Sequence, residues 1–304
     1  MFRTIIINTG EIAYLKEDWL VVSTDDGEKS VPINDLYSVV IDNPSIKLTV
    51  MLLNRLTESG AHVILCGRNH LPATVILPNN SYYRPLSVLK KQITLVDDCK
   101  NEIWRCIVRV KLRNQASVMN FCGGNRERIQ RVLELSESVT GDDEGNNEAI
   151  AAKLFFRDMY GSGFIRQNDD SINAALNYGY AIIRSAVSKS LVAHGFNCTL
   201  GIHHRNEFNE FNLADDMMEP LRPLVDYWVY TNREDLYDEL SRDNRASLVN
   251  LINVPVLIDG KRQKLRNAIE SYVVSFVKCV NDEKPSMITI PEIYRKCFLK
   301  EEND

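Results

Sequence analysis

Residues 78–83 of the chain read PNNSYY, a polar, turn-forming stretch at which the hydrophobic pattern changes. Before it, short runs rich in Val, Ile, Tyr and Thr indicate strands. After it, the apolar residues recur with a period near 3.6, which indicates helices. We therefore interpret this stretch as a linker between a domain of residues 1–80 and a domain of residues 81–304. The expected fold class is α+β, with a small N-terminal β-sheet domain followed by a larger, mostly α-helical domain.

The N-terminal domain is expected to be a small β domain with one helix. The sequences NTG at 8–10 and DDG at 25–27 are typical of hairpin turns. A helix is predicted over residues 47–58 and ends before Gly60. The expected strands cover residues 3–7, 11–16, 19–23, 29–33, 37–41 and 62–65.

The C-terminal domain contains long stretches with helical periodicity. A further helix is predicted from about residue 147, and the loop GSGFIRQNDD at 161–170 separates it from the helix that begins at 171. A polar, glycine-containing loop of this kind can move or contact a ligand. The other expected helices cover residues 86–96, 101–119, 125–138 and 171–193.

The composition is typical of a soluble globular protein, because 44% of the 304 residues are hydrophobic and 25% are charged. The seven cysteines are odd in number and form no CxxC pair, so neither a disulfide framework nor a zinc site is indicated. The N-terminal stretch MFRTIIINTGEIAYLKE is too polar, and its apolar run too short, for a signal peptide or a membrane span. We expect a cytoplasmic protein that does not associate with a membrane.

Positive charge is concentrated in one part of the chain, although the net charge is −5. Residues 84–128 carry ten Lys or Arg against four Asp or Glu, whereas residues 1–82 carry six against nine. A concentrated basic face can engage phosphates even on an acidic protein. The alternative interpretation is a solvated helix face. The basic residues of the run are Arg84, Lys90, Lys91, Lys100, Arg105, Arg109, Lys111, Arg113, Arg126 and Arg128.

Three separate segments carry acidic and imidazole groups that can act together. Glu148 falls in the first turn of its predicted helix, where the helix dipole alone also favours a carboxylate. His203 and His204 are adjacent, so their side chains usually point apart and at most one of them serves a given site. Asp216 and Glu219 lie three residues apart beside an apolar helical stripe, and the alternative there is an acidic surface face.

Two prolines interrupt the segment around Glu219. Pro220 and Pro223 each remove a backbone donor, so the helix expected over residues 213–228 begins or is distorted here. This pattern places the Glu219 carboxylate at the margin of a buried surface.

A glutamate, a histidine and a second carboxylate together suit a divalent cation. Oxygen ligands favour Mg²⁺ or Mn²⁺, and the imidazole favours Mn²⁺ without excluding Mg²⁺. Zinc is less suitable because the chain has no cysteine pair and no HExxH pattern. An ion with open coordination positions can bind a phosphate oxygen and an attacking hydroxyl together, so the set predicts phosphodiester chemistry.

Four ordered sequence blocks at and around these segments resemble the CRISPR-associated integrase family, specifically the larger of the two core proteins that insert new spacers. The resemblance spans nearly the whole chain, because it also covers the order of a β domain before a helical domain. The compact length and the form of the blocks look like the version found beside type II effector nucleases. The blocks are Glu148 with AAKLFF at 151–156, NAALNYGY at 173–180, GIHH at 201–204 and DMMEPLRP at 216–223.

That resemblance implies that Glu148, His204 and Glu219 are the catalytic residues and the ligands of Mg²⁺ or Mn²⁺. Asp216 matches an additional acidic position near the site. The segment RNEFNEF at 205–211 differs from the shorter, glycine-containing stretch that is often found there. The register is therefore judged from spacing, and His203 replaces His204 as the ligand if it differs by one residue.

The resemblance also implies partners. The β domain would form a homodimer, and two such dimers would bind a dimer of a smaller second subunit. Further type II adaptation proteins and the effector nuclease are additional candidate partners. The assembly would bind a DNA duplex with exposed 3′ ends in the cytoplasm of a prokaryote. Each 3′-hydroxyl would then attack a phosphodiester at a border of the CRISPR repeat, a transesterification catalysed by the helical domain.

Several side chains are candidates for contact with that DNA. Basic side chains are expected to contact phosphates, and aromatic rings are expected to stack on a splayed base. The phosphate candidates are Lys90, Lys91, Arg105, Arg109, Lys111 and Arg166, and the stacking candidates are Phe164 and Tyr160.

Two other functions use the same residues. A metal-dependent nuclease would hydrolyse DNA with water as the nucleophile and the same ligands. A non-catalytic DNA-binding or scaffold subunit would keep the three groups for structural reasons. The joining of two DNA ends separates the first alternative, and substitution of Glu148 separates the second.

Overall fold

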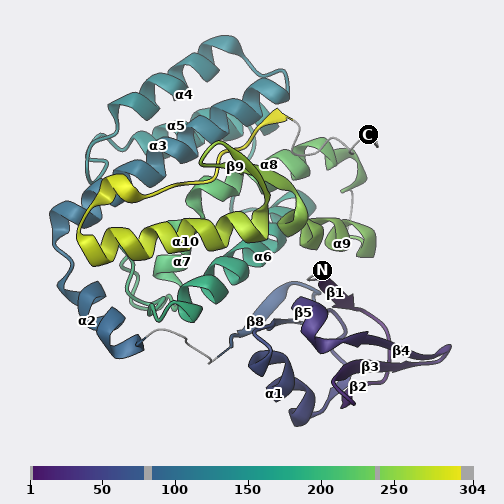
Figure 1. The fold of residues 1–304 in the computed structure, drawn as a ribbon. Coiled ribbons are helices and arrows are strands. Elements are labelled where there is room, and N and C mark those ends of the chain that lie inside the picture. Colours follow the sequence, from purple (N-terminus) through teal and green to yellow (C-terminus); the bar gives the residue numbers. More distant parts are fainter. Residues whose placement is uncertain (1–2, 79–83, 237–239, 296–304) are drawn as a thin grey trace. The chain divides into compact units, whose positions relative to one another are not determined.

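The computed structural model describes residues 3–78, 84–236 and 240–295 of the chain. It divides into two compact units, which we call the N-terminal unit (residues 1–85 with 192–195) and the helical unit (residues 86–191 with 196–304). Residues 79–83 of the predicted linker lie outside the described residues. The structure confirms the expected α+β class, because strands dominate the first part of the chain and helices the remainder (Figure 1).

The N-terminal unit contains two four-stranded sheets and one helix, α1 (Val50–Glu58). In the first sheet three strands are parallel and the last, β8, is antiparallel. The first sheet has the order β1 (Arg3–Ile7), β5 (Leu36–Ile41), β7 (His62–Cys66) and β8 (Pro72–Ile76). The second has the order β4 (Gly27–Pro32), β3 (Trp19–Thr24), β2 (Ile12–Lys16) and β6 (Lys47–Leu48).

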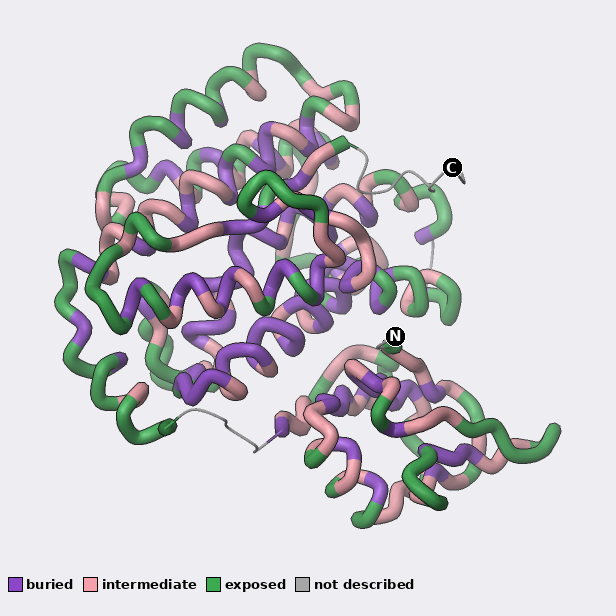
Figure 2. Tube along the Cα trace, in the orientation of Figure 1, coloured by how far each residue is buried: buried purple, intermediate pink, exposed green. Residues whose placement is uncertain are grey.

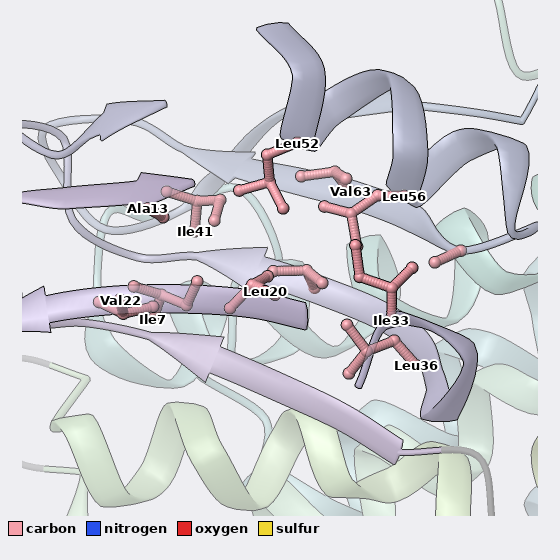
Figure 3. Close-up of a cluster of buried hydrophobic side chains, with 12 residues drawn as sticks. Ile7, Ala13, Leu20, Val22, Ile33, Leu36, Ile41, Leu52, Leu56 and Val63 are labelled. Atoms are coloured by element: carbon pink, nitrogen blue, oxygen red, sulfur yellow. The ribbon is translucent and has the colours of Figure 1, made fainter. Parts of the chain in front are cut away.

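A single apolar cluster holds the helix and both sheets of this unit together. Leu52 and Leu56, one helical turn apart, are each 1% exposed. Figure 3 shows them reaching from α1 into a cluster that includes Leu20 of β3 and Val63 of β7. Each sheet buries one face against this cluster, and that burial stabilises the unit.

Most of the predicted strands are confirmed within one or two residues, and so is the DDG hairpin turn between β3 and β4. The prediction of a hairpin at NTG was wrong, because β1 and β2 belong to different sheets. Gly10 is needed there for another reason: its φ is 109°, and a Cβ would lie 2.6 Å from a methyl group of Val22. The predicted start of the helix at residue 47 was also wrong, because residues 47–48 form β6 and Thr49 caps α1.

The helical unit is built mainly from long helices, and two of them supply much of its core. In Figure 2 the purple stretches of α3 and α6 mark this burial. The helices are α2 (Pro85–Thr94), α3 (Asp97–Phe121), α4 (Arg126–Ser138), α5 (Asn147–Tyr160), α6 (Ser171–Ala193), α7 (Asn212–Met218), α8 (Arg222–Thr231), α9 (Arg242–Asn250) and α10 (Leu265–Asp282). Short 3₁₀ turns are η1 (Ile33–Asp35, in the N-terminal unit), η2 (Glu219–Leu221), η3 (Arg233–Asp235), η4 (Leu251–Asn253) and η5 (Pro285–Met287).

Helices α3, α4 and α5 pack against one another, and α3 also packs on η2 and α8 (Figure 1). The predicted helices are confirmed, with α3 starting four residues earlier than expected, and residues 161–170 form the predicted loop. A hairpin of β9 (Pro255–Ile258) and β10 (Lys261–Lys264) was not predicted. Within the described ranges, no helix is long and apolar enough to cross a membrane.

Candidate active site

Glu148 lies at the start of α5, as predicted, but a residue outside the helix caps this end. The Asp143 carboxylate accepts hydrogen bonds from the backbone N–H groups of Asn147 and Glu148, each at 2.9 Å. Asn146 stands at the N-cap position without a capping bond from its side chain. Because Asp143 already satisfies these donors, the Glu148 carboxylate is free to bind elsewhere, and it accepts from Lys111 Nζ at 2.6 Å.

Glu219 lies on η2, where the two prolines interrupt the helix as predicted and divide it into α7 and α8. Its carboxylate is buried, accepting from Lys111 Nζ on one oxygen and from Arg222 Nε at 2.7 Å on the other. Burial alone would raise the pKa of Glu219, but the charges of Arg222 and Lys111 outweigh it and hold the pKa at about 2. The group is therefore ionised at neutral pH despite its burial.

His204 is held by Asp216, a completely buried carboxylate of α7. Asp216 accepts His204 Nδ1 at 2.6 Å, and it also accepts the backbone N–H groups of Ile202 at 2.6 Å and of His203 and His204 at 3.1 Å. The bond to Asp216 raises the pKa of His204 above its ordinary value. It also assigns the Nδ1 position as the donor, so that Nε2 is the ring atom able to act as a ligand.

The two adjacent histidines have different surroundings, and their rings are nearly perpendicular, at 87°. His203 stacks on the buried ring of Trp104, with centroids 4.2 Å apart and planes 3° apart. His204 meets the same indole ring edge-on, at 5.9 Å. The ring of His203 is therefore engaged by packing on α3, whereas that of His204 is oriented by a carboxylate.

Lys111 of α3 joins the segments that carry the predicted site residues. Its ammonium donates to Glu148 of α5 and to Glu219 of η2, and its side chain is buried. Burial would lower the pKa of Lys111, but Glu219 and Glu148 together raise it above its ordinary value. The charge of Glu219 also contributes to the raised pKa of His204. Glu219 thus interacts electrostatically with His204 and, through Lys111 of α3, is linked to Glu148.

The donor set fits a hard or borderline divalent cation. Two carboxylates already converge on one positive charge, and an imidazole with its Nδ1 fixed supplies a nitrogen ligand. As the side chains stand, no three His, Cys, Asp or Glu groups among the described residues are close enough to hold a metal ion. The ammonium of Lys111 lies at the point that Glu148 and Glu219 share.

Most of the basic residues expected to contact phosphates are paired within the protein. Arg105 pairs with Glu102, and Arg109 Nη2 lies 2.7 Å from Glu137 Oε2. Lys91 donates to the Asn281 side chain at 2.9 Å. Lys90 is exposed on α2, and Lys111 differs from all of these because it is buried in the candidate site.

The loop candidates lie at and beyond the end of α5. Arg166 donates to the side chains of Asn173 at 3.0 Å and Asn177 at 2.7 Å, so its guanidinium is tied to α6. Phe164 stacks on Tyr160, with ring centroids 4.7 Å apart, and Tyr160 in turn donates to the backbone oxygen of Asp226. Phe164 and Arg166 remain partly exposed, so both can still be reached from solvent.

Lys111 was predicted as a phosphate contact and not as a member of the metal-site cluster, and no role was predicted for Trp104, Asp143 or Arg222. One signal for Lys111 was present in the sequence. Residue 111 follows Ile103 and Ile107 at intervals of four, so it continues a stripe that is fully buried on α3. A lysine on such a stripe needs a buried anionic partner, which would have directed attention to this position.

The family model and the sequence relatives agree on one family. Residues 4–156 and 163–244 match the family model described as CRISPR associated protein Cas1. The chain is similar to the CRISPR-associated endonuclease Cas1 of Neisseria meningitidis serogroup C (strain 8013), with 35% identity over 96% of each protein. Its fold is similar to that of a casposase bound to integration product, with a TM-score of 0.77, 20% identity and coverage of 93% of this chain and 92% of the other. A further similar structure is a Cas6-RT-Cas1–Cas2 complex, with a TM-score of 0.74, 16% identity and coverage of 98% of this chain and 36% of the other.

Proposed function

The chain belongs to the CRISPR-associated protein Cas1 family, and from that premise we propose that it is a metal-dependent DNA integrase of CRISPR adaptation. In the proposed reaction, the 3′-hydroxyl ends of a short DNA duplex attack phosphodiesters at the borders of the CRISPR repeat. The proposal rests mainly on one observation. The carboxylates of Glu148 and Glu219 both bind the ammonium of Lys111, and they do so beside a histidine whose ring is fixed by a buried carboxylate.

Glu148, His204 and Glu219 are the residues that would hold Mg²⁺ or Mn²⁺. The chemistry that such an ion supplies when bound is a lower pKa for the attacking hydroxyl and neutralisation of the charge that builds on the phosphorus. Transesterification exchanges one phosphodiester for another, so the reaction requires no nucleotide cofactor.

The side chains around these residues prepare them for that role. Asp216 fixes the His204 ring through Nδ1 and thereby orients Nε2. Arg222 and Lys111 keep Glu219 ionised, with a pKa of about 2, although it is buried. Asp143 holds the first turn of α5, which fixes the backbone that carries Glu148. Charges and backbone hydrogen bonds thus orient each of these three residues.

DNA and a second subunit are the proposed partners. The proposed DNA contacts are the exposed Lys90, the neighbouring basic residues Lys91, Arg105 and Arg109, and the loop residues Phe164 and Arg166. The similarity to a Cas1–Cas2 complex supports a smaller Cas2-type subunit as partner, and we propose that the N-terminal unit forms the homodimer. Additional adaptation proteins and an effector nuclease belong to the same proposal.

An integration assay tests the reaction. The purified chain, with and without a Cas2-type subunit, is incubated with a duplex carrying free 3′ ends, a supercoiled plasmid containing a CRISPR repeat, and Mn²⁺ or Mg²⁺. Joined product is expected for the wild type and none for Glu148→Gln. Cut plasmid without joined product would instead identify a nuclease, and equal joining by the variant would exclude Glu148 from the reaction.

A charge-reversal series tests the proposed DNA surface. Lys90→Glu, Lys91→Glu, Arg105→Glu and Arg109→Glu are expected to weaken duplex binding and to reduce its dependence on salt, because each removes a counterion-releasing contact. The other three substitutions also break contacts within the protein. Lys90 is exposed, so Lys90→Glu is expected to act through DNA binding alone. If the whole series left binding and its salt dependence unchanged, the basic run would have no role in DNA binding.

A further inference from the structure

Lys111 donates hydrogen bonds to both proposed carboxylate ligands. It donates to Glu148 Oε1 at 2.6 Å and to Glu219 Oε2, while Arg222 engages the other oxygen of Glu219. Its side chain is only 7% exposed, so solvent does little to screen these contacts. The ammonium therefore neutralises the two carboxylates in the same place where a divalent ion would have to bind them.

An ammonium and a divalent cation cannot share those oxygens. Both are positive, and a metal ligand must offer its lone pairs to the ion at about 2.0–2.2 Å, which leaves no room for a hydrogen-bonded ammonium between the same atoms. A lysine is well suited to leave such a position, because its charge is compact and is carried on a flexible four-carbon stem. An arginine in the same place would be held by a rigid, forked set of bonds.

We propose that Lys111 is a built-in counter-cation that competes with the divalent metal ion for Glu148 and Glu219. This inference rests on the proposed function, since it takes these carboxylates as metal ligands. Lys111 acts as a positioning residue: it holds the two anionic side chains together on one charge, and its ammonium leaves their oxygens when the ion binds. The affinity for the metal ion then depends on how much more strongly the two carboxylates bind the ion than they bind the Lys111 ammonium.

A purely structural ion pair predicts the opposite response to substitution. If Lys111 only maintained the shape of the site, its removal would let the two carboxylates move apart and would weaken metal binding. If Lys111 competes with the ion, its removal leaves a more negative site with no internal cation, and metal binding becomes tighter. The direction of the change in affinity therefore distinguishes the two roles.

Calorimetric titration of Mn²⁺ into the full-length chain, without DNA, measures that direction. Lys111→Met replaces the ammonium by an apolar group of similar length and is expected to bind Mn²⁺ on the order of tenfold more tightly than the wild type. The rise in melting temperature on addition of Mn²⁺ is expected to be larger in the variant as well. Lys111→Gln, which is neutral and keeps a polar amide donor, is the second variant in case the first does not fold, and tighter binding is expected for it too.

Lys100→Met is the matched control. It removes one positive charge from the same helix, where Lys100 pairs with the exposed Asp97 at 3.2 Å, and it is expected to leave Mn²⁺ affinity unchanged. Equal tightening in this control would show a general effect of net charge and would overturn the competition. Unchanged or weaker Mn²⁺ binding by the Lys111 variants would also overturn it.

Glu148→Gln separates this inference from the proposed function. If the wild type binds Mn²⁺ and Glu148→Gln weakens binding, the metal site of the proposed function stands whatever the Lys111 variants do. If the wild type shows no Mn²⁺ binding that depends on Glu148, the metal site itself fails, and the competition fails with it.

Discussion

Asp216 accepts hydrogen bonds both from the ring Nδ1 of His204, at 2.6 Å, and from the backbone N–H of the same residue, at 3.1 Å. A single buried carboxylate therefore fixes both the main chain and the side chain of this histidine. It lies three residues before Glu219, so α7 carries the orienting group for one proposed ligand and leads directly into the other.

Substitution of Asp216 is expected to lower stability strongly. Asp216→Asn keeps the size of the side chain but removes the charge and replaces one acceptor oxygen with an amide donor, which leaves buried N–H groups poorly satisfied. The free energy of unfolding is expected to fall by about 2–4 kcal/mol, measured by urea denaturation. Asp97→Asn, at an exposed ion pair, is the control and is expected to change it by less than about 1 kcal/mol. Equal stabilities of the two variants would contradict this role of Asp216.

Gly201 is required because the chain comes very close to it. A Cβ at this position would collide with the carbonyl oxygen of His204 and lie 2.8 Å from Asp216 Oδ2. Gly201→Ala is therefore expected to displace the loop of His204, to lower the free energy of unfolding by about 1–3 kcal/mol, and to reduce DNA joining. Gly163→Ala is the control, since a Cβ there meets no described atom within 4 Å. Thermal denaturation and the integration assay measure both variants, and a wild-type result for Gly201→Ala would refute the steric argument.

The two glutamates are expected to differ in their contribution to stability. Glu219 is 4% exposed and binds two cations, whereas the side chain of Glu148 is 29% exposed and binds one. Glu219→Gln removes the charge that compensates the buried Lys111 and the half-buried Arg222, so a loss of about 3–5 kcal/mol is expected, against about 1 kcal/mol for Glu148→Gln. Urea denaturation of both variants tests this. Comparable losses in the free energy of unfolding would show that the deeper burial of Glu219 does not make it more important for stability than Glu148.

Asp226 is expected to make stability depend on pH. Burial raises the pKa of this carboxyl to about 7, although the hydrogen bond from Tyr180 opposes the shift. Because the folded chain binds the proton more tightly than the unfolded chain, this contribution to stability is greatest below about pH 4 and is lost as the pH rises through 7.

Asp226→Asn, which is neutral at every pH and still accepts from Tyr180, is expected to lose this dependence. Between pH 4 and pH 8 the wild type should lose up to roughly 4 kcal/mol relative to the variant. Chemical denaturation at several pH values measures the difference. A constant difference across that range would show that Asp226 does not titrate there.

Local patterns predicted much of the fold, because they depend on neighbours in sequence. The runs of β-branched and aromatic residues in β1 and β3 and the long apolar stripe of α6 predicted those elements nearly to the residue. The division of the strands into two sheets could not be predicted in this way, since the parallel pairing of β1 with β5 joins residues more than thirty positions apart. The β9–β10 hairpin was missed because it is short and stands among helices.

The candidate site was predictable in its parts but not in its assembly. Spacing and residue type identified Glu148, the pair His203 and His204, Asp216 and Glu219 as groups worth considering together, and the family resemblance implied His204 rather than His203. The bond from Lys111 to two carboxylates depends on how α3 packs against α5 and η2, which no local pattern contains. The ring of His203 likewise found its partner, Trp104, about a hundred residues away in the sequence.

The stacking of His203 on Trp104 gives the site an optical reporter. The buried Trp104 indole is in face contact with one imidazole and in edge contact with another, so its fluorescence is expected to respond to a change at either ring. The chain has three tryptophans, and replacing Trp19 and Trp228 by Phe would leave this emission as the only indole signal. Events at His204 could then be followed in real time without attaching any label.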